Sequence, residues 1–299
     1  MIIVQLLGGL GNQMFQYALG RHLAVLNSCE LKLDIEGFAA DPLREYHLNH
    51  FGLQQTFASS KEINILKYGH NNLPLVTATN FINRVSRRLT GEKLIKKHTY
   101  LIEKKIFTFC SEILKLSGNL YLEGYWQSEN YFASIREILL EDFLMRTSSN
   151  ATNSKFLEQI KESNSVSVHV RRGDYASDPQ TSKLYACCTT DYYKAATEII
   201  NKRVKNARFF VFSDDPDWAE SNLSFENQVV VRGNTADNGQ EDLHLMQNCR
   251  HNIIANSSFS WWGAWLNQNP DKIVIAPKTW INLPDIDTRD ATPKNWLRI

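Results

Sequence analysis

The feature that most restricts the fold is a regular alternation of strand-like and helix-like segments in the second half of the chain. Short runs of β-branched and aromatic residues recur there, and longer amphipathic segments separate them. We expect strands at 165–170, 208–212, 228–231, 252–255 and 272–276, and helices at 153–162, 191–205, 240–249 and after 256. Asp191 is the expected N-cap of the second helix. Strands joined through helices pair in parallel, so this half predicts a Rossmann-type α/β sheet.

The first half of the chain opens with the same order of elements. A strand is expected at 2–7, a glycine turn at 8–13, a helix at 14–24 and a second strand at 29–34. A loop region follows at 36–60, a strand runs from Tyr121 toward Glu129, and a helix is expected at 129–144. Residues 147–154 are rich in Ser, Thr and Asn, which is typical of a linker. We therefore expect two domains, 1–150 and 151–299.

Composition excludes several classes of protein. The chain has 299 residues and a formal net charge of +1, so no overall field favours nucleic acid as a partner. It has five cysteines without metal-ligand spacing, which fits a reducing cytoplasm better than a disulfide framework or a zinc site. No apolar run is long enough to span a membrane, and no signal peptide is recognisable. The composition indicates a cytoplasmic globular enzyme.

The strand at 165–170 ends in two arginines, Arg171 and Arg172, followed by Gly173 and Asp174. Ligands of open α/β sheets lie outside the carboxyl ends of the strands. A guanidinium binds two phosphate oxygens at once, which an ammonium group does not do. The pattern predicts an anion site, for a diphosphate in the first place. The alternative is a pair of surface arginines bonded to acidic neighbours.

Two further strand ends carry polar residues. Asp214 and Asp215 follow one strand, and Asn256, Ser257 and Ser258 follow another. The latter group stands before a helix, where it either caps free N–H groups or helps to bind phosphate. Three nearby indoles more often belong to a core than to a ligand site, and at least two are expected to be buried: Trp261, Trp262 and Trp265.

Asp215 and Asp217 have the spacing of a metal-binding pair, but Pro216 between them favours the start of a helix that turns Asp217 away. The arginines already supply the positive charge that a cation would bring. The sequence therefore predicts no metal.

The glycine turn near the N-terminus admits two interpretations. Gly9 and Gly11, with Asp34 at the end of the next strand, fit part of a dinucleotide-binding pattern. Met14 stands where that pattern needs a small residue, which argues against an NAD site. Asn12 and Gln13 at the helix start are instead expected to point into a cleft.

Residues 84–105 are strongly basic, which indicates either a solvated helix face or a patch that docks on anionic lipid headgroups. The cluster of Tyr, Trp, Gln and Glu at 121–129 suits either a sugar site or a buried surface between domains.

Taken together, the chain resembles the bacterial α1,2-fucosyltransferases, which are inverting enzymes that use GDP-fucose. Three stretches carry the resemblance: Gly8–Tyr17, His169–Tyr175 and Ser257–Leu266. The corner at Phe212–Asp215 and the segment Gly124–Gln127 also look like family features. The His-x-Arg-Arg-x-Asp motif is shared with α1,6- and protein O-fucosyltransferases, so it points to GDP-fucose more than to the linkage. The first and third stretches point to α1,2 transfer.

The resemblance implies a GT-B-type fold, with two Rossmann-like domains that face each other across a cleft. Residues 1–150 would bind the acceptor and 151–299 the donor. The implied donor-site residues are Gly9, Gly11, Asn12, His169, Arg171, Arg172, Asp174, Asp214, Asn256, Ser257, Ser258 and Phe259. Among them, Arg171 and Arg172 would hold the diphosphate, and His169 and Asp214 would contact the nucleoside.

The implied activity is transfer of L-fucose from GDP-β-L-fucose to the 2-hydroxyl of a galactose-containing glycan, free or lipid-linked, without a cofactor. It would serve surface polysaccharide (O-antigen) synthesis, in the cytoplasm or on the inner face of the cytoplasmic membrane. Arg171 and Asn12 are expected at the reacting groups, and candidates for the general base are Asp34, Glu123 and Glu129. The alternatives are a fucosyltransferase of another linkage, an NAD-dependent Rossmann enzyme or a non-catalytic carbohydrate-binding protein.

Overall fold

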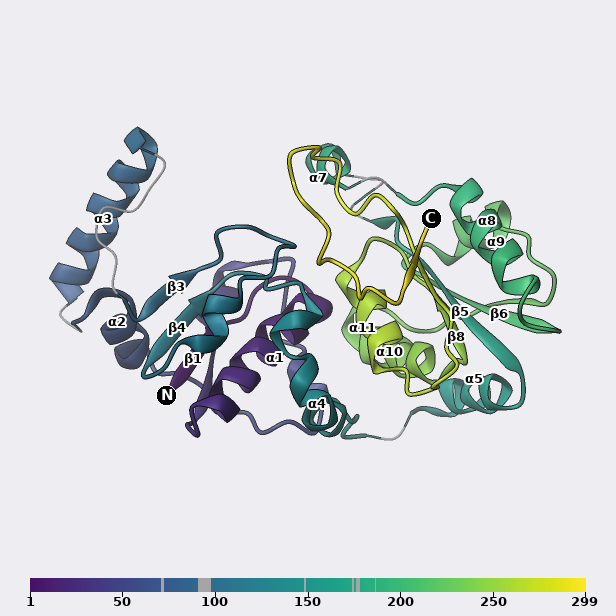
Figure 1. Cartoon of the computed structure of the whole chain (residues 1–299), viewed down its shortest axis with the longest axis horizontal. Coiled ribbons are helices and arrows are strands. Elements are labelled where there is room, and N and C mark those ends of the chain that lie inside the picture. The colour runs from purple at the N-terminus through teal and green to yellow at the C-terminus, as the bar shows by residue number, and fades with distance from the viewer. Residues whose placement is uncertain (71–72, 91–97, 148, 174, 176–177, 186) are drawn as a thin grey trace. The chain divides into compact units, whose positions relative to one another are not determined.

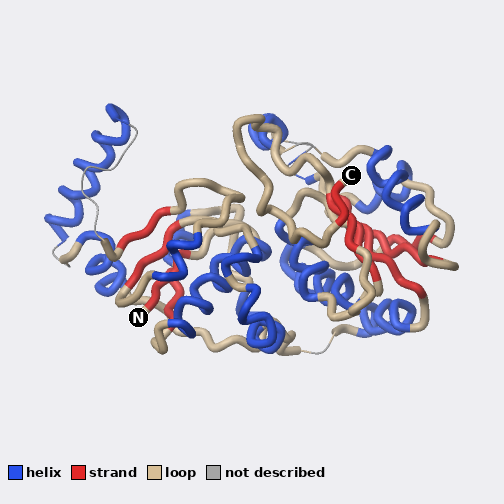
Figure 2. Tube along the Cα trace, in the orientation of Figure 1, coloured by secondary structure: helices blue, strands red, loops and turns tan. Residues whose placement is uncertain are grey.

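The computed structural model describes residues 1–70, 73–90, 98–147, 149–173, 175, 178–185 and 187–299. This part of the chain forms two compact units. Unit 1 comprises Met1–Asn49 and Leu53–Asp142, and unit 2 comprises His50–Gly52 and Phe143–Ile299. Each unit contains its own parallel sheet with helices packed on it (Figures 1 and 2), which confirms the predicted α/β fold. The acceptor and donor roles of the two halves stay predictions.

The sheet of unit 1 has the strand order β2-β1-β4-β3. The strands are β1 (Ile2–Gln5), β2 (Leu31–Asp34), β3 (Tyr100–Ile102) and β4 (Leu120–Glu123). The helices are α1 (Leu10–Leu26), α2 (Ser60–Tyr68), α3 (Leu73–Thr90) and α4 (Arg136–Asp142), with 3-10 turns at Glu36–Ala40, Leu48–His50, Ser111–Lys115, Glu129–Tyr131 and Ala133–Ile135. The strands expected near the start and the end of this half are thus present. Helix α2 and strand β3 were not foreseen, and α3 overlaps only the beginning of the basic stretch 84–105, for which a solvated helix was one interpretation.

The sheet of unit 2 has the order β10-β9-β8-β5-β6-β7, and all its strands are parallel. The strands are β5 (Asn164–Val170), β6 (Ala207–Ser213), β7 (Gln228–Val230), β8 (His251–Ile253), β9 (Val274–Ala276) and β10 (Leu297–Arg298). The helices are α5 (Ala151–Lys161), α7 (Pro179–Leu184), α8 (Thr190–Asn201), α9 (Pro216–Asn222), α10 (Gly239–Asn248) and α11 (Ser258–Leu266), with a 3-10 turn at Ala236–Asn238. The alternation read from the sequence is confirmed strand by strand, apart from β10.

Strand periodicity separates the two faces of this sheet. Val166, Val168 and Val170 pack with residues of α8 and α9 in one buried cluster. Phe210 and Phe212 of β6 point the other way and pack with residues of α5 and α10 (Figure 1). Because β5 and β6 pair in parallel and in register, His169 lies on the α10 side, opposite to its neighbours Val168 and Val170.

Two local predictions are wrong. Asp191 does not cap α8, because the helix begins one residue earlier and the Thr189 side chain accepts the hydrogen bond from the Tyr192 amide. The segment 129–144 is not one helix: two 3-10 turns precede α4, and Phe132 between them has φ −149° and ψ 2°, outside the helical region. A helical hydrophobic period in the sequence does not reveal such a break.

A short segment of the first half belongs to unit 2. The Gly52 amide donates to the Leu144 carbonyl at 2.7 Å, and the Arg146 amide donates to the His50 carbonyl at 3.0 Å. The Phe51 ring meets the Phe143 ring edge-on at 5.7 Å, and both are buried. Residues 50–52 are thus a built-in part of the second unit.

No helix in the described ranges is long and apolar enough to cross a membrane.

Candidate active site

The parallel register of β5 and β6 brings Arg171 and Asp214 together. Val170 pairs with Ser213 at the end of the two strands, so the residue that follows each strand leaves the sheet at the same point. The Arg171 Nη1 atom lies 2.7 Å from Asp214 Oδ2, and the Arg172 amide donates to Asp214 Oδ1 at 2.8 Å. Both side chains of the ion pair are about one-quarter exposed, at 26% and 25%. The pair fixes a guanidinium at the carboxyl edge of the sheet while leaving part of it open to solvent.

Arg172 makes different contacts. Its Nε lies 3.4 Å from Asp215 Oδ2, and its guanidinium carbon lies 3.9 Å from the centre of the Trp218 ring. Asp215 also caps α9, since its Oδ1 accepts the Trp218 amide hydrogen bond at 3.1 Å. Arg172 therefore joins the end of β5 to the start of α9.

Gly173 lies tightly against the ion pair. A Cβ atom on this residue would stand 2.5 Å from Asp214 Oδ2, closer than nonbonded atoms allow. The glycine thus permits the carboxylate to reach Arg171. Asp174, a predicted donor-site residue, falls outside the described residues.

His169 is buried beneath this edge. Its side chain is 5% exposed, and the ring lies 5.6 Å from the Phe259 ring. Burial, helped by the positive charge of Arg171, lowers the pKa of His169 to about 3. Within the described part of the chain its Nδ1 atom has no hydrogen-bond partner. A neutral, fixed imidazole with an unsatisfied nitrogen is suited to one hydrogen bond with a ligand.

This burial predicts a pH-dependent stability that His169 controls. The folded pKa of about 3 lies below the unfolded value near 6.5, so the unfolded chain takes up a proton first as the pH falls. The contribution of neutral His169 is complete above pH 6.5 and is lost toward pH 3, at up to about 1.4 kcal/mol per pH unit. We expect His169→Gln to flatten the fall in unfolding free energy between pH 6.5 and 5, measured by urea titration. Equal slopes for the two proteins would contradict this account.

The start of α11 lies at the same edge of the sheet. Ser257 caps the helix by accepting the Phe259 amide hydrogen bond at 3.3 Å, and Ser258 is the first helical residue. Asn256 is 4% exposed, with its side chain bonded to the Trp280 carbonyl and the Cys188 thiol. Ser257 therefore does cap the helix, and the amide of Asn256 is held inside the unit.

Tyr175 connects this helix start to the arginine. Its hydroxyl donates to the Asn256 carbonyl at 3.2 Å, while the Arg171 guanidinium carbon lies 5.5 Å from its ring centre. Most predicted residues of the second half thus converge at the ends of β5, β6 and β8. Whether each of them binds the donor stays a prediction.

Two acids at the start of α10, Glu241 and Asp242, were not predicted from the sequence as candidate site residues. Glu241 is 6% exposed, and within the described residues its Oε2 has no hydrogen-bond partner. Burial raises the pKa of Asp242 to about 6, although a hydrogen bond from Asn234 opposes the change. The helix start lies near Phe259, since a Cβ on Gly239 would be 3.6 Å from that ring. Acids in a first helical turn are common, so the sequence carries no signal that sets these apart.

In unit 1 the glycine turn forms as expected, with a positive φ of 75° at Gly8. The Asn12 Oδ1 atom accepts a hydrogen bond from Gln127 at 2.7 Å. Gln13 is fully buried and does not point into a cleft: its amide group donates to the Gly8 and Glu45 carbonyls and accepts from the His47 amide. Gly9 and Gly11 flank the same turn, at the start of α1.

The predicted general bases lie in a polar network on this sheet. Asp34 is 4% exposed, and its Oδ2 accepts a hydrogen bond from the Tyr121 hydroxyl at 2.5 Å. Glu123 accepts a hydrogen bond from the Tyr100 hydroxyl and lies 3.7 Å from Lys67 Nζ, with its own side chain 26% exposed. Of these two carboxylates, Glu123 is the more accessible to a substrate. Glu129, the third candidate, opens a 3-10 turn.

Glu103 is a further carboxyl group near this sheet that was not predicted from the sequence. It accepts hydrogen bonds from the amides of Tyr125 and Trp126, at 2.7 and 3.1 Å. Burial raises its pKa in spite of these bonds. These bonds hold a turn in which Trp126, although not a glycine, has a positive φ of 57°.

The acidic pair around Pro216 is divided between two structural tasks. Asp215 caps α9, and Asp217 Oδ1 bonds to Arg232 at 2.8 Å, with its side chain 88% exposed. The two carboxylates are therefore not directed at one cation. No cluster of three or more His, Cys, Asp or Glu residues that suits a metal occurs among the described residues.

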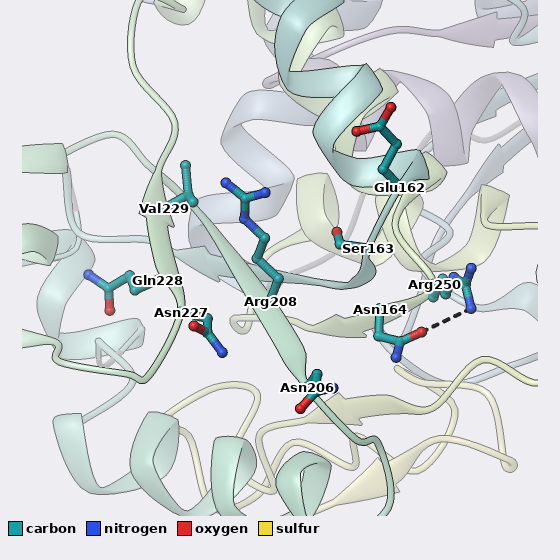
Figure 3. Close-up of a pocket in the computed structure, with 9 residues that line it drawn as sticks. All are labelled: Glu162, Ser163, Asn164, Asn206, Arg208, Asn227, Gln228, Val229 and Arg250. Atoms are coloured by element: carbon teal, nitrogen blue, oxygen red, sulfur yellow. Dashed lines mark hydrogen bonds between the residues drawn. The ribbon is translucent and has the colours of Figure 1, made fainter.

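A cavity of about 560 Å³ lies at the opposite edge of the same sheet (Figure 3). Its lining comes from the residues at or just before the starts of β5, β6, β7 and β8: Glu162, Ser163, Asn164, Asn206, Arg208, Asn227, Gln228, Val229 and Arg250. Its arginines bond to neutral groups, Arg208 to Gln159 and Arg250 to Asn164. The predicted residues of unit 2 lie at the carboxyl ends of the strands, so this cavity is separate from them.

Two α/β units with parallel sheets agree with the GT-B-type fold that the resemblance implies, and in unit 2 an arginine is fixed where ligands of such sheets bind. A solved structure supports the fold: a mutant of Arabidopsis thaliana FUT1 in complex with GDP aligns with a TM-score of 0.50 at 11% identity, covering 99% of this chain and 75% of that one.

Comparison of sequences defines the family. Residues 1–299 match Glycosyl transferase family 11, and the chain belongs to that family. An alpha-1,2-colitosyltransferase of Escherichia coli is 35% identical over 100% of this chain and 98% of its own length. The O-antigen biosynthesis glycosyltransferase WbnK of Escherichia coli is 36% identical over 91% of this chain and 92% of its own. The protein is a glycosyltransferase, and the NAD-dependent and non-catalytic alternatives are wrong.

Proposed function

We propose that the chain transfers L-fucose from GDP-β-L-fucose to the 2-hydroxyl of a galactose-containing glycan, with inversion, in the synthesis of an O-antigen-type polysaccharide. The observation that carries the proposal is the Arg171–Asp214 pair at the carboxyl edge of β5 and β6. The relatives named above include a sugar transferase of α1,2 linkage and an O-antigen glycosyltransferase, which supports both the linkage and the pathway.

The partly exposed Arg171 meets the main chemical demand of this reaction. As the bond to the anomeric carbon breaks, negative charge grows on the departing diphosphate. A guanidinium already fixed by Asp214 stabilises that charge without reorganising, which is worth several kcal/mol at such sites. The N-terminus of α11 lies at the same edge, and the positive end of its helix dipole favours an anion. In this proposal Arg172 supports the site through α9.

The nucleoside would bind beside His169 and Phe259. The neutral imidazole offers its Nδ1 atom, and Glu241 offers an acceptor at the start of α10. Both groups are already buried without a partner for these atoms. A hydrogen bond to the nucleoside would therefore offset the free energy that their desolvation costs.

The acceptor hydroxyl needs a base, and unit 1 supplies the candidates. We assign Glu123 ahead of Asp34, because Asp34 is nearly enclosed and bonded to Tyr121. Attack on the face opposite to the diphosphate converts a β-linked donor into an α-linked product. Loss of a general base typically lowers the rate by about 10²–10⁴-fold.

A donor panel tests the proposal. Colitose is fucose without its 3-hydroxyl group. Because a colitosyltransferase is similar to this chain over its whole length, GDP-colitose is the donor that the panel must compare with GDP-fucose. The purified chain is incubated with lactose or a longer galactose-terminated glycan and either GDP-fucose or GDP-colitose, and the product linkage is determined by NMR. We expect an α1,2-fucosyl product and a kcat/KM for GDP-fucose at least about tenfold above that for GDP-colitose. Preference for GDP-colitose, or a linkage other than α1,2, would refute the assignment.

We also expect the reaction to run without a divalent cation. Arg171 supplies the positive charge, and the acids around Pro216 are engaged in capping α9 and in pairing with Arg232. Transfer should therefore continue in excess EDTA with little loss. A fall of more than about tenfold that Mg²⁺ or Mn²⁺ restores would show that a metal neutralises the diphosphate.

A further inference from the structure

Helix α3 (Leu73–Thr90) exposes an apolar stripe to solvent. Leu75 is 52% exposed and Ile82 is 39% exposed, and Ala78 between them is also exposed. Their spacing of three and four residues places them on one line along the helix. Figure 1 shows α3 beyond α2 in unit 1, away from the sheet, and α3 contacts α2.

The two residues of α3 that are buried in its described part are polar, and Val76 is half-buried. Thr79 is 8% exposed and Asn83 is 6% exposed. A helix that packs on its own core has the opposite arrangement, with the apolar stripe inward. The hydrophobic effect therefore favours a partner that covers Leu75, Ala78 and Ile82.

The charge of α3 indicates the chemistry of that partner. Within Leu73–Thr90 the sequence has three arginines, Arg84, Arg87 and Arg88, and no Asp or Glu. Arg84 is exposed. A cationic helix with an exposed apolar stripe is typical of segments that lie in the plane of a membrane surface.

We propose that α3 docks on an anionic lipid bilayer. Leu75, Ala78 and Ile82 enter the boundary between headgroups and acyl chains, and the exposed Arg84 meets lipid phosphates. A second copy of the chain fits less well, because a symmetric contact would place two positively charged, acid-free helices together. The basic stretch 84–105 overlaps the end of this helix, and its residues 91–97 fall outside the described part of the chain. Lipid binding of this kind does not depend on which sugar the enzyme transfers.

Vesicle flotation with the purified full chain tests the proposal. Vesicles of phosphatidylcholine alone are compared with vesicles that contain about one-third phosphatidylglycerol. We expect binding to the anionic vesicles that weakens between 0.1 and 0.5 M NaCl, because salt screens the arginines. The variant Leu75→Gln with Ile82→Gln should bind about tenfold more weakly or worse, since each residue loses its apolar contact with lipid.

A matched control removes exposed apolar side chains elsewhere in unit 1. Val25 and Leu26 of α1 are 37% and 52% exposed, so Val25→Gln with Leu26→Gln removes a similar apolar surface. This control should bind lipid as the wild type does, and both variants should keep the wild-type Tm and activity on a water-soluble acceptor. The proposal is overturned if the wild type ignores anionic vesicles or if the α3 variant binds as well as the control. It is equally overturned if the α3 variant only turns a dimer into a monomer.

Discussion

Arg171→Lys should reduce kcat/KM for the nucleotide-sugar donor by roughly thirtyfold or more, which corresponds to about 2 kcal/mol of transition-state stabilisation. Lysine keeps the positive charge, but it cannot bond to Asp214 and to a phosphate through one planar group. The loss should appear with little change in Tm, because Arg171 is about one-quarter exposed and contributes no core packing. Steady-state kinetics and thermal unfolding of each variant provide the measurement.

The neighbouring arginine and a distant one supply the comparison. Arg172→Ala should lower Tm as well as activity, because it removes the contacts with Asp215 and Trp218 that join β5 to α9. Arg208→Lys makes the same chemical change at the opposite edge of the sheet, where Arg208 bonds to Gln159, and should leave kcat/KM within about twofold of wild type. If Arg171→Lys keeps more than half of the wild-type kcat/KM, the bidentate phosphate role of Arg171 is wrong.

Trp262→Ala should cost about 3–5 kcal/mol of unfolding free energy. The indole is fully buried, and it meets the rings of Phe143, Trp261 and Trp265 at 5.1–5.2 Å. Truncation leaves a cavity that the neighbouring rings cannot fill. Helix α11 cannot move closer to α10 to close it, because Gly263 of α11 already lies tightly against Met246 of α10. Urea unfolding provides the free energy, and a fall in Tm of about 10 °C should accompany it.

Leu144→Ala is the control for this truncation, since Leu144 is 58% exposed and its loss should cost less than about 0.5 kcal/mol. Trp262→Phe keeps most of the apolar volume and should fall between the two. A loss below 1 kcal/mol for Trp262→Ala would mean that the indole cluster does not stabilise unit 2 as described.

The sequence predicted the arrangement at the carboxyl end of β5 well, because strand periodicity acts locally. The alternation in β5 placed His169 and Arg171 on one side and Val168 and Val170 on the other, and the buried cluster of valines confirms the latter. The expectation that Trp261, Trp262 and Trp265 are core residues is also confirmed, at 0%, 0% and 4% exposure. These properties follow from a few neighbouring residues and needed no knowledge of distant contacts.

What escaped prediction depends on contacts between distant segments. The burial of Glu241 follows from how α10 packs, and the enclosure of Asp34 needs Tyr121 from a strand 87 residues away in sequence. Gln13 was expected in a cleft, yet it holds the loop at 45–47, because several backbone groups there need a partner. The apolar stripe of α3 was missed since periodicity indicates that a face is apolar, and not whether the protein covers it.

Residues 50–52 decide whether unit 2 can be studied by itself. A fragment that begins near residue 143 lacks the backbone partners of Leu144 and Arg146 and leaves Phe143 without the ring of Phe51. Its aromatic surface would then favour aggregation over a clean folding transition. A single cleavage of the chain cannot release either unit intact, since unit 1 would lose its continuity or unit 2 its inserted segment. Supplying residues 50–52 as a tethered peptide is the simplest way to make the second unit self-sufficient.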